Sequence, residues 1–99
     1  MNRKPRLEQL LDVSLHLTNV TKEELLSKER TNEINICRGI YLLLSFEFGY
    51  KPCQSCKLIK RSRVSCLITM NRYLGYYQVG DKVITNLFLN ALKILRYGL

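Results

Sequence analysis

The sequence predicts one compact all-α domain of five or six helices that includes a helix-turn-helix. Apolar residues recur at three- and four-residue spacing along most of the chain, which is the pattern of helices with one buried face. Only two prolines interrupt the 99 residues, and the hydrophobic fraction of 46% is too high for a disordered chain. A chain of this length supports a single modest core, so residues 1–99 are expected to form one domain.

The first segment, residues 6–30, is expected to contain two helices and a basic loop. Four leucines recur at helical spacing: Leu7, Leu10, Leu11 and Leu15. They predict a helix over residues 6–17, although the alternation of apolar residues over 13–17 is a weaker pattern typical of a strand. Thr21 and Glu24 have the spacing of a capping box, so a short second helix is expected to begin at Thr21.

A long central helix is expected over residues 32–48. Its apolar positions form a broad stripe that consists of Ile34, Ile36, Cys37, Ile40, Tyr41, Leu43, Leu44 and Phe48. A stripe of this width is typical of a helix surrounded by others, so this helix is expected to lie at the centre of the domain. Gly49 follows the last apolar residue and provides a C-terminal stop.

Residues 52–76 are expected to form two helices joined by a short basic turn. Pro52 suits the first position of a helix, because an N–H at that position has no partner within the helix. Lys60 and Arg61 form the turn, and Ser62 provides a cap for the next helix. The residues expected to be buried are Cys53, Cys56 and Ile59 in the first helix and Leu67, Met70 and Leu74 in the second.

A last amphipathic helix is expected over residues 81–96, opened by Gly80 and Asp81. Its apolar residues are Val83, Ile84, Leu87, Phe88, Ala91, Leu92 and Leu95. Their helical spacing gives the segment one apolar face, which completes the core formed by the preceding helices. The residues expected inside that core include Ile34, Ile40, Leu44, Leu67 and Leu87.

Positive charge is the strongest functional signal in the sequence. The net charge is +8, and residues 48–80 contain six Lys or Arg residues and no Asp or Glu. Charge of one sign within an ordered helical pattern is typical of a surface that meets phosphate groups, so nucleic acid is the expected partner. The longest apolar run, residues 40–44, is too short to span a membrane, and no signal peptide is recognisable. We therefore expect a cytoplasmic protein without a membrane partner.

The basic turn and the start of the helix after it contain the residues that we expect to contact DNA. A helix fits the major groove of double-stranded DNA, with its N-terminal turn closest to the bases. The residues suited to base edges at that turn are Arg61, Ser62, Arg63 and Ser65. The residues suited to phosphates at its rims are Lys57, Lys60 and Arg72.

The region over residues 25–47 has a further pattern. It reads Leu25-Leu26-Ser27-Lys28-Glu29-Arg30-Thr31-Asn32-Glu33-Ile34, followed by Arg38, Tyr41-Leu42 and Glu47. This region resembles the entry to the C-terminal DNA-binding domain of the bacterial replication initiator DnaA, and the order of helices extends the resemblance over about residues 6–95. The resemblance implies a fold like DnaA domain IV and the Trp repressor, and a role in replication initiation. It also implies that Arg30, in the basic loop, enters the minor groove.

The segment Lys60-Arg61-Ser62-Arg63-Val64-Ser65-Cys66 departs from the family's signature, which is of the type Gly-Arg-Asp-His-Thr-Thr-Val. The arginine and the second hydroxyl are kept, whereas the Asp, the His and the first Thr are lost. The resemblance therefore implies the mode of DNA binding but not the family's preferred DNA sequence. The sequence also lacks the glycine-rich nucleotide-binding loop of ATPases, so a stand-alone DNA-binding module without ATPase activity is expected.

The cysteines allow a different interpretation. Cys53 and Cys56 have the spacing of metal ligands. Residues elsewhere in the chain would complete a zinc site: Cys66 with Cys37 or His16. These residues do not form a second clustered pair, as zinc ligands usually do, so we expect reduced thiols in the core and no metal. His16 is expected to be a surface or partly buried packing residue.

No paired carboxylates, nucleophile with a base, or phosphate-binding loop is recognisable, so neither an enzyme nor a cofactor is expected.

Two interpretations of the function remain. The first is a sequence-specific module for double-stranded DNA that acts as a monomer, with other replication or regulatory proteins as further partners. The second is a helical protein-interaction domain on the same scaffold that no longer recognises DNA. Stacking of single-stranded nucleic acid on tyrosines is disfavoured, because only residues 73–77 place tyrosines near a basic residue.

Overall fold

Six helices make up nearly all of the described chain. The computed structural model describes residues 4–27 and 31–97. The helices are α1 (Leu7–Thr18), α2 (Lys22–Leu26), α3 (Asn32–Glu47), α4 (Pro52–Leu58), α5 (Arg63–Gln78) and α6 (Lys82–Tyr97), and the described residues contain no strand. The predicted all-α fold is therefore confirmed, and the strand alternative over residues 13–17 is wrong, because these residues belong to α1. Within the described ranges, no helix is both long and apolar enough to cross a membrane.

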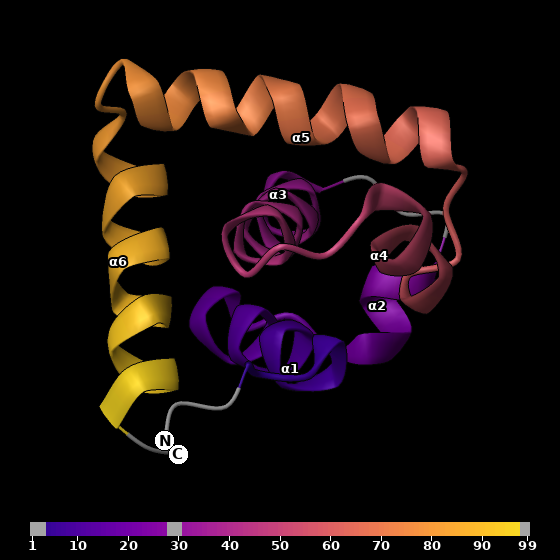
Figure 1. Ribbon diagram of the computed structural model, residues 1–99, viewed down its shortest axis with the longest axis horizontal. Coiled ribbons are helices and arrows are strands. Elements are labelled where there is room, and N and C mark those ends of the chain that lie inside the picture. Colours follow the sequence, from indigo (N-terminus) through magenta and orange to yellow (C-terminus); the bar gives the residue numbers. More distant parts are fainter. Residues whose placement is uncertain (1–3, 28–30, 98–99) are drawn as a thin grey trace.

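The long helix α3 lies at the centre of the domain. In Figure 1 it is seen nearly end-on between α1 and α5, with α6 along a third side. All residues from Cys37 to Ser45 are buried, and α3 contacts each of the other five helices. A helix buried on several sides needs apolar residues around most of its circumference, which explains the broad apolar stripe in the sequence.

Tyr41, the largest fully buried side chain, links α3 to α4. Its hydroxyl donates a hydrogen bond of 2.9 Å to the backbone carbonyl of Ser55. Burial of the phenol is the main reason why the pKa of Tyr41 lies above its ordinary value. Because a buried hydroxyl without a partner is costly, this hydrogen bond helps to determine where α4 docks on the core.

Side-chain caps determine where several helices begin. Thr21 accepts a hydrogen bond from the backbone N–H of Glu24, and the Glu24 carboxylate accepts one from the N–H of Thr21, so the predicted capping box is confirmed. The hydroxyl of Ser62 accepts a hydrogen bond of 3.1 Å from the N–H of Ser65 and caps α5, as predicted. Asp81 caps α6 through its carboxylate in the same way.

Helices α4 and α5 follow one another across a short basic turn. As predicted, α4 begins at Pro52. In the turn, Lys60 has a φ angle of 54°, a left-handed conformation that glycine adopts more easily than other residues. α5 then runs for 16 residues across α3 and α4 (Figure 1) and presents its opposite face to solvent.

Part of the predicted core is confirmed. Ile34, Ile40 and Leu44 are buried. Leu67, Leu74 and Leu87 are only half-buried, so their prediction as buried core residues is wrong. The buried residues of α5 are Cys66, Met70 and Tyr73. Leu67 therefore lies at the margin of the stripe that faces the core.

The predicted buried face of α4 is confirmed at Cys56 and Ile59 but not at Cys53. Cys53 is exposed, whereas Ser55, Cys56 and Ile59 are buried. The helix has only seven residues, and the hydrogen bond from Tyr41 to the Ser55 carbonyl holds that part of it against the core. The prediction that Cys53 is buried is therefore wrong, because a tertiary contact rather than periodicity decides which side of so short a helix docks.

Two helical glycines have opposite relations to the packing. At Gly39 in α3, a Cβ atom would overlap the ring of Tyr73 from α5, so only glycine allows the two helices to approach in this way. At Gly75 in α5, a Cβ atom would meet no other atom within 4 Å. Packing thus requires the first glycine and does not require the second.

We expect Gly39→Ala and Gly75→Ala to change the free energy of unfolding in opposite directions. Gly39→Ala should lower it by roughly 1–3 kcal/mol, because the ring of Tyr73 has to move. Gly75→Ala should raise it by about 0.5–1 kcal/mol, because alanine is the better helix former and enters open space. Chemical denaturation of both variants beside the parent chain measures the two changes. Destabilisation by Gly75→Ala would contradict the open space at that position.

Candidate nucleic-acid interface

A groove lies between the first turns of α3 and one flank of α5. It has a volume of about 610 Å³ and is lined by residues of both helices and of the turn before α5. Three arginines line it: Arg38, Arg61 and Arg72. None of the described residues that line it is acidic, so the groove is a region of positive potential.

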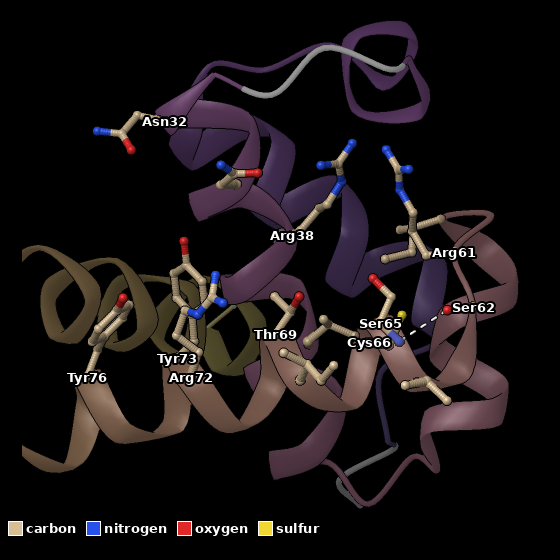
Figure 2. Close-up of a pocket in the computed structure, with 15 residues that line it drawn as sticks. Asn32, Arg38, Arg61, Ser62, Ser65, Cys66, Thr69, Arg72, Tyr73 and Tyr76 are labelled. Carbon is tan, nitrogen blue, oxygen red and sulfur yellow. Dashed lines mark hydrogen bonds between the residues drawn. The ribbon is translucent and has the colours of Figure 1, made fainter.

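One flank of α5, together with its cap, supplies polar side chains to the groove. They recur at three- and four-residue spacing, which places them on one side of the helix. They are Ser62, Ser65, Thr69, Arg72 and Tyr76. Figure 2 shows this row below the start of α3, where Asn32 belongs to the opposite wall. Asn35, also on α3, lines the groove as well. Both walls thus offer hydroxyl, amide or guanidinium donors of the kind that contact phosphates and base edges.

Two of the arginines reach the end of α2. Nη2 of Arg38 donates a hydrogen bond of 2.8 Å to the carbonyl of Leu25, and Nη2 of Arg61 donates one of 3.1 Å to the carbonyl of Ser27. Figure 2 shows the two guanidinium groups pointing in the same direction. Carbonyl groups at a helix C-terminus lack partners within the helix, so cations are favourable there. The two arginines therefore fasten the end of α2 to α3 and to the turn before α5.

The position of Arg61 differs from the one expected. The sequence suggests a side chain that extends from the start of α5 toward DNA bases, but Arg61 is half-buried and hydrogen-bonded to Ser27. Its partner lies 34 positions away in the chain, a contact that no local pattern indicates. Arg61 also lines the groove, so it contributes charge there while it holds the end of α2.

The structure brings only some of the other expected DNA contacts together. Those that are exposed and line the groove are Ser62, Ser65 and Arg72. Those that are exposed but do not line it are Lys57, Lys60 and Arg63. Arg30 lies outside the described residues. The groove therefore contains a polar subset of the expected site, and three further cations lie outside it.

Sequence reasoning missed several side chains of this groove. Asn32 and Asn35 precede the acid-free stretch from residue 48 to 80 that indicated the site. Arg38 is only 9% exposed, and a charge in the middle of an apolar helix does not by itself indicate a groove. Thr69 had a usable signal, because it continues the helical spacing of the polar residues on the same flank of α5.

Two tyrosines form an aromatic pair at the groove. The rings of Tyr73 and Tyr76 meet edge to face, with their centroids 5.2 Å apart. Tyr73 is buried, and burial raises its pKa above the ordinary value. Tyr76 is 40% exposed. Tyr73 therefore serves mainly to pack α5 on α3, whereas Tyr76 is accessible to a ligand.

The cysteines are free thiols in different surroundings. Cys37, Cys56 and Cys66 are buried, and Cys53 is exposed. Burial, together with the neighbouring thiol of Cys56, raises the pKa of Cys66 to about 11, so this thiol stays protonated at neutral pH. In the part of the chain that the structure describes, no three His, Cys, Asp or Glu side chains gather in a way that would hold a metal ion. His16 lies on α1 and is exposed, which agrees with the expectation of a surface or partly buried residue.

We expect a water-soluble aromatic disulfide reagent to modify one thiol rapidly near pH 8 and the other three only after denaturation. Cys53 is the exposed thiol, whereas the other cysteines are shielded from the reagent by burial. Spectrophotometric release of the reagent's thiolate measures both phases. Cys53→Ser should abolish the fast phase and leave the melting temperature unchanged. A fast phase that survives in this variant would show that a buried thiol is open to solvent.

Comparisons with known proteins assign no family to this arrangement. No protein family, no curated protein and no solved structure matches the chain. The groove and the exposed side of α5 are therefore the features from which a function has to be argued.

Proposed function

We propose that the chain binds double-stranded DNA, with α5 in the major groove. The observation that carries the proposal is the groove between α3 and α5, which is lined by three arginines and by no acidic residue among its described walls. The 16 residues of α5 correspond to a length of about 24 Å. Beside the groove, α5 presents an exposed side along this length. A major groove about 12 Å wide accommodates one helix of this kind.

One sugar–phosphate strand would lie along the protein groove. When α5 occupies the major groove, the strand at its edge runs beside the helix and toward the start of α3. Arg72, Thr69 and Asn35 then have donors for phosphate oxygens from both walls. Arg38 and Arg61 add positive charge behind them. Neutralised phosphates release counterions to solution, and this release favours binding.

The exposed residues at the start of α5 would recognise bases. Arg63 and Ser65 are exposed in the N-terminal turn, the part of a recognition helix that comes closest to base edges. The arginine can donate two hydrogen bonds to O6 and N7 of guanine. Lys57 and Lys60, exposed at the other side of the turn, would contact flanking phosphates. Arg61 would act mainly by positioning, because it is hydrogen-bonded to the end of α2.

The proposal includes a relationship to the C-terminal domain of DnaA, based on the resemblance of residues 25–47. In that binding mode Arg30 enters the adjacent minor groove, and the chain acts as a nucleoid-associated monomer. The hydrogen bonds to the carbonyls of Leu25 and Ser27 support this mode, because they hold the end of α2 against α3 and the turn before α5.

A protein-interaction domain is the second candidate. Val79 and Val83, near the junction of α5 and α6, are 82% and 57% exposed. Exposed apolar surface is typical of a site that meets another protein when it forms a contiguous patch. In this alternative the arginines of the groove only hold α2 in place, and the chain does not bind DNA.

The affinity of the chain for random duplex DNA should fall steeply as the salt concentration rises. Arg72→Ala should weaken binding to every duplex about equally, because a phosphate contact carries no sequence information. It should also reduce the slope of log affinity against log salt by about one unit. Fluorescence anisotropy titrations at several salt concentrations measure both quantities.

Lys93→Ala is the matched control, because Lys93 is an exposed cation on α6 that does not line the groove. It should leave the affinity and the slope close to those of the parent chain. Absence of duplex binding at ~50 mM salt, a condition in which phosphate attraction is strong, would reject the proposal and favour the protein-interaction domain.

Arg61→Ala and Arg63→Ala should affect different properties. Arg61→Ala removes the hydrogen bond to Ser27 and should lower the free energy of unfolding as well as the affinity. Arg63→Ala, at an exposed position, should change stability by less than about 0.5 kcal/mol. It should cost about 1–3 kcal/mol of binding on a preferred site and much less on random DNA. Thermal melting and titrations of the same preparations separate the two effects. An affinity of Arg63→Ala for the preferred site equal to that of the parent would exclude Arg63 as a base contact.

A further inference from the structure

Two apolar side chains lie on the exposed face of α5. Val64 and Ile68 are 66% and 55% exposed and lie one helical turn apart, in the first two turns of the helix. Neither belongs to the core or to the half-buried residues that pack against it. The helical repeat puts them opposite the buried stripe of α5, which consists of Cys66, Met70 and Tyr73. Packing within this chain therefore does not account for the two apolar residues.

Gly75 lies on the same face, seven residues after Ile68. A Cβ atom at this position would meet no other atom within 4 Å, so the fold does not require glycine there. Glycine inside a helix lowers its stability relative to alanine. The absence of a side chain does, however, allow an external surface to approach the backbone of α5 closely. The face is thus suited to contact with a ligand.

Polar side chains border the apolar pair on both sides. Ser65 and Arg72 lie on one side, Asn71 lies on the other, and all three are exposed. Val64 and Ile68 are themselves among the residues that line the groove, together with Ser65 and Arg72. The apolar surface is therefore a narrow strip between hydrogen-bonding groups. A protein partner usually covers a broader contiguous apolar patch. A ligand that alternates small apolar groups with polar edges fits this strip better.

We propose that Val64 and Ile68 contact the C5-methyl groups of two thymines in the major groove, an inference that rests on the proposed binding of duplex DNA. Among the hydrogen-bonding edges of that groove, the thymine methyl is the distinctive apolar group. Side chains at positions i and i+4 of a helix are about 5–6 Å apart at Cβ. Base pairs are stacked about 3.4 Å apart. The two methyl groups therefore belong to adjacent base pairs or to pairs with one between them.

Replacement of thymine by deoxyuridine tests this inference, because uracil keeps every hydrogen-bonding group of thymine and lacks only the methyl. A preferred duplex is first selected from a random library with the parent chain. Each thymine of that duplex is then replaced singly, and the dissociation constants are compared. A loss of about four-fold is expected at each of two closely spaced thymines, which is the effect of one buried methyl group.

Two variants connect each methyl group to one side chain. Val64→Ala should remove the sensitivity to deoxyuridine at one of the two positions, and Ile68→Ala should remove it at the other. Both residues are exposed, so both variants should keep the melting temperature of the parent. Val83→Ala is the matched control, since Val83 is an exposed valine on α6, and it should keep the sensitivity at both positions.

The possible failures of the inference and of the proposed function are distinguishable. Absence of binding to any duplex would overturn both. Selection of no preferred sequence, or equal affinity for all the deoxyuridine duplexes, would overturn the recognition of thymine and leave DNA binding intact. Sensitivity at both positions that persists in the double variant Val64→Ala/Ile68→Ala would assign the methyl contacts to other residues and overturn the inference.

Discussion

The close packing of α5 on α3 is the constraint on which the rest of the structure depends. At Gly39 the ring of Tyr73 occupies the space that any larger side chain would need, so the two helices meet directly. α3 itself is held by contacts with all the other helices. The position of α5 therefore follows from the core, and with it the two walls of the charged groove and the side of α5 that remains exposed. The buried contact between Gly39 and Tyr73 thus determines the shape of the candidate DNA-binding surface.

The arginines of the groove combine a structural and an electrostatic role. Arg38 is almost removed from water, which is unfavourable for a guanidinium group unless protein acceptors replace the lost solvent. The carbonyl of Leu25, at the end of α2, is such an acceptor. Arg61 uses the carbonyl of Ser27 in the same way. Because these contacts also fasten a helix, the positive charge of the groove is part of the fold and not only a feature of the surface.

The sequence was sufficient to predict the helices, because their starts depend on local caps at Thr21 and Ser62 and on apolar periodicity. For α4 it predicted the burial of Cys56 and Ile59 but not the exposure of Cys53, since a helix of seven residues has too few positions for a clear stripe and a distant tyrosine helps to decide which side docks. The groove was only partly predictable. The absence of Asp and Glu from residues 48–80 indicated the wall formed by α5. The wall formed by α3, and the hydrogen bond of Arg61 to Ser27, depend on contacts between residues far apart in the chain.

The hydrogen bond from Arg61 to Ser27 links the start of α5 to the end of α2, two segments that are distant in the chain. If each segment contributes its own contact to a polyanion, this link makes them a preorganised pair. Once one contact has formed, the other is presented at a high effective concentration, and less conformational entropy remains to be lost. The avidity of the pair then exceeds the affinity of either segment alone, although the link itself touches no ligand.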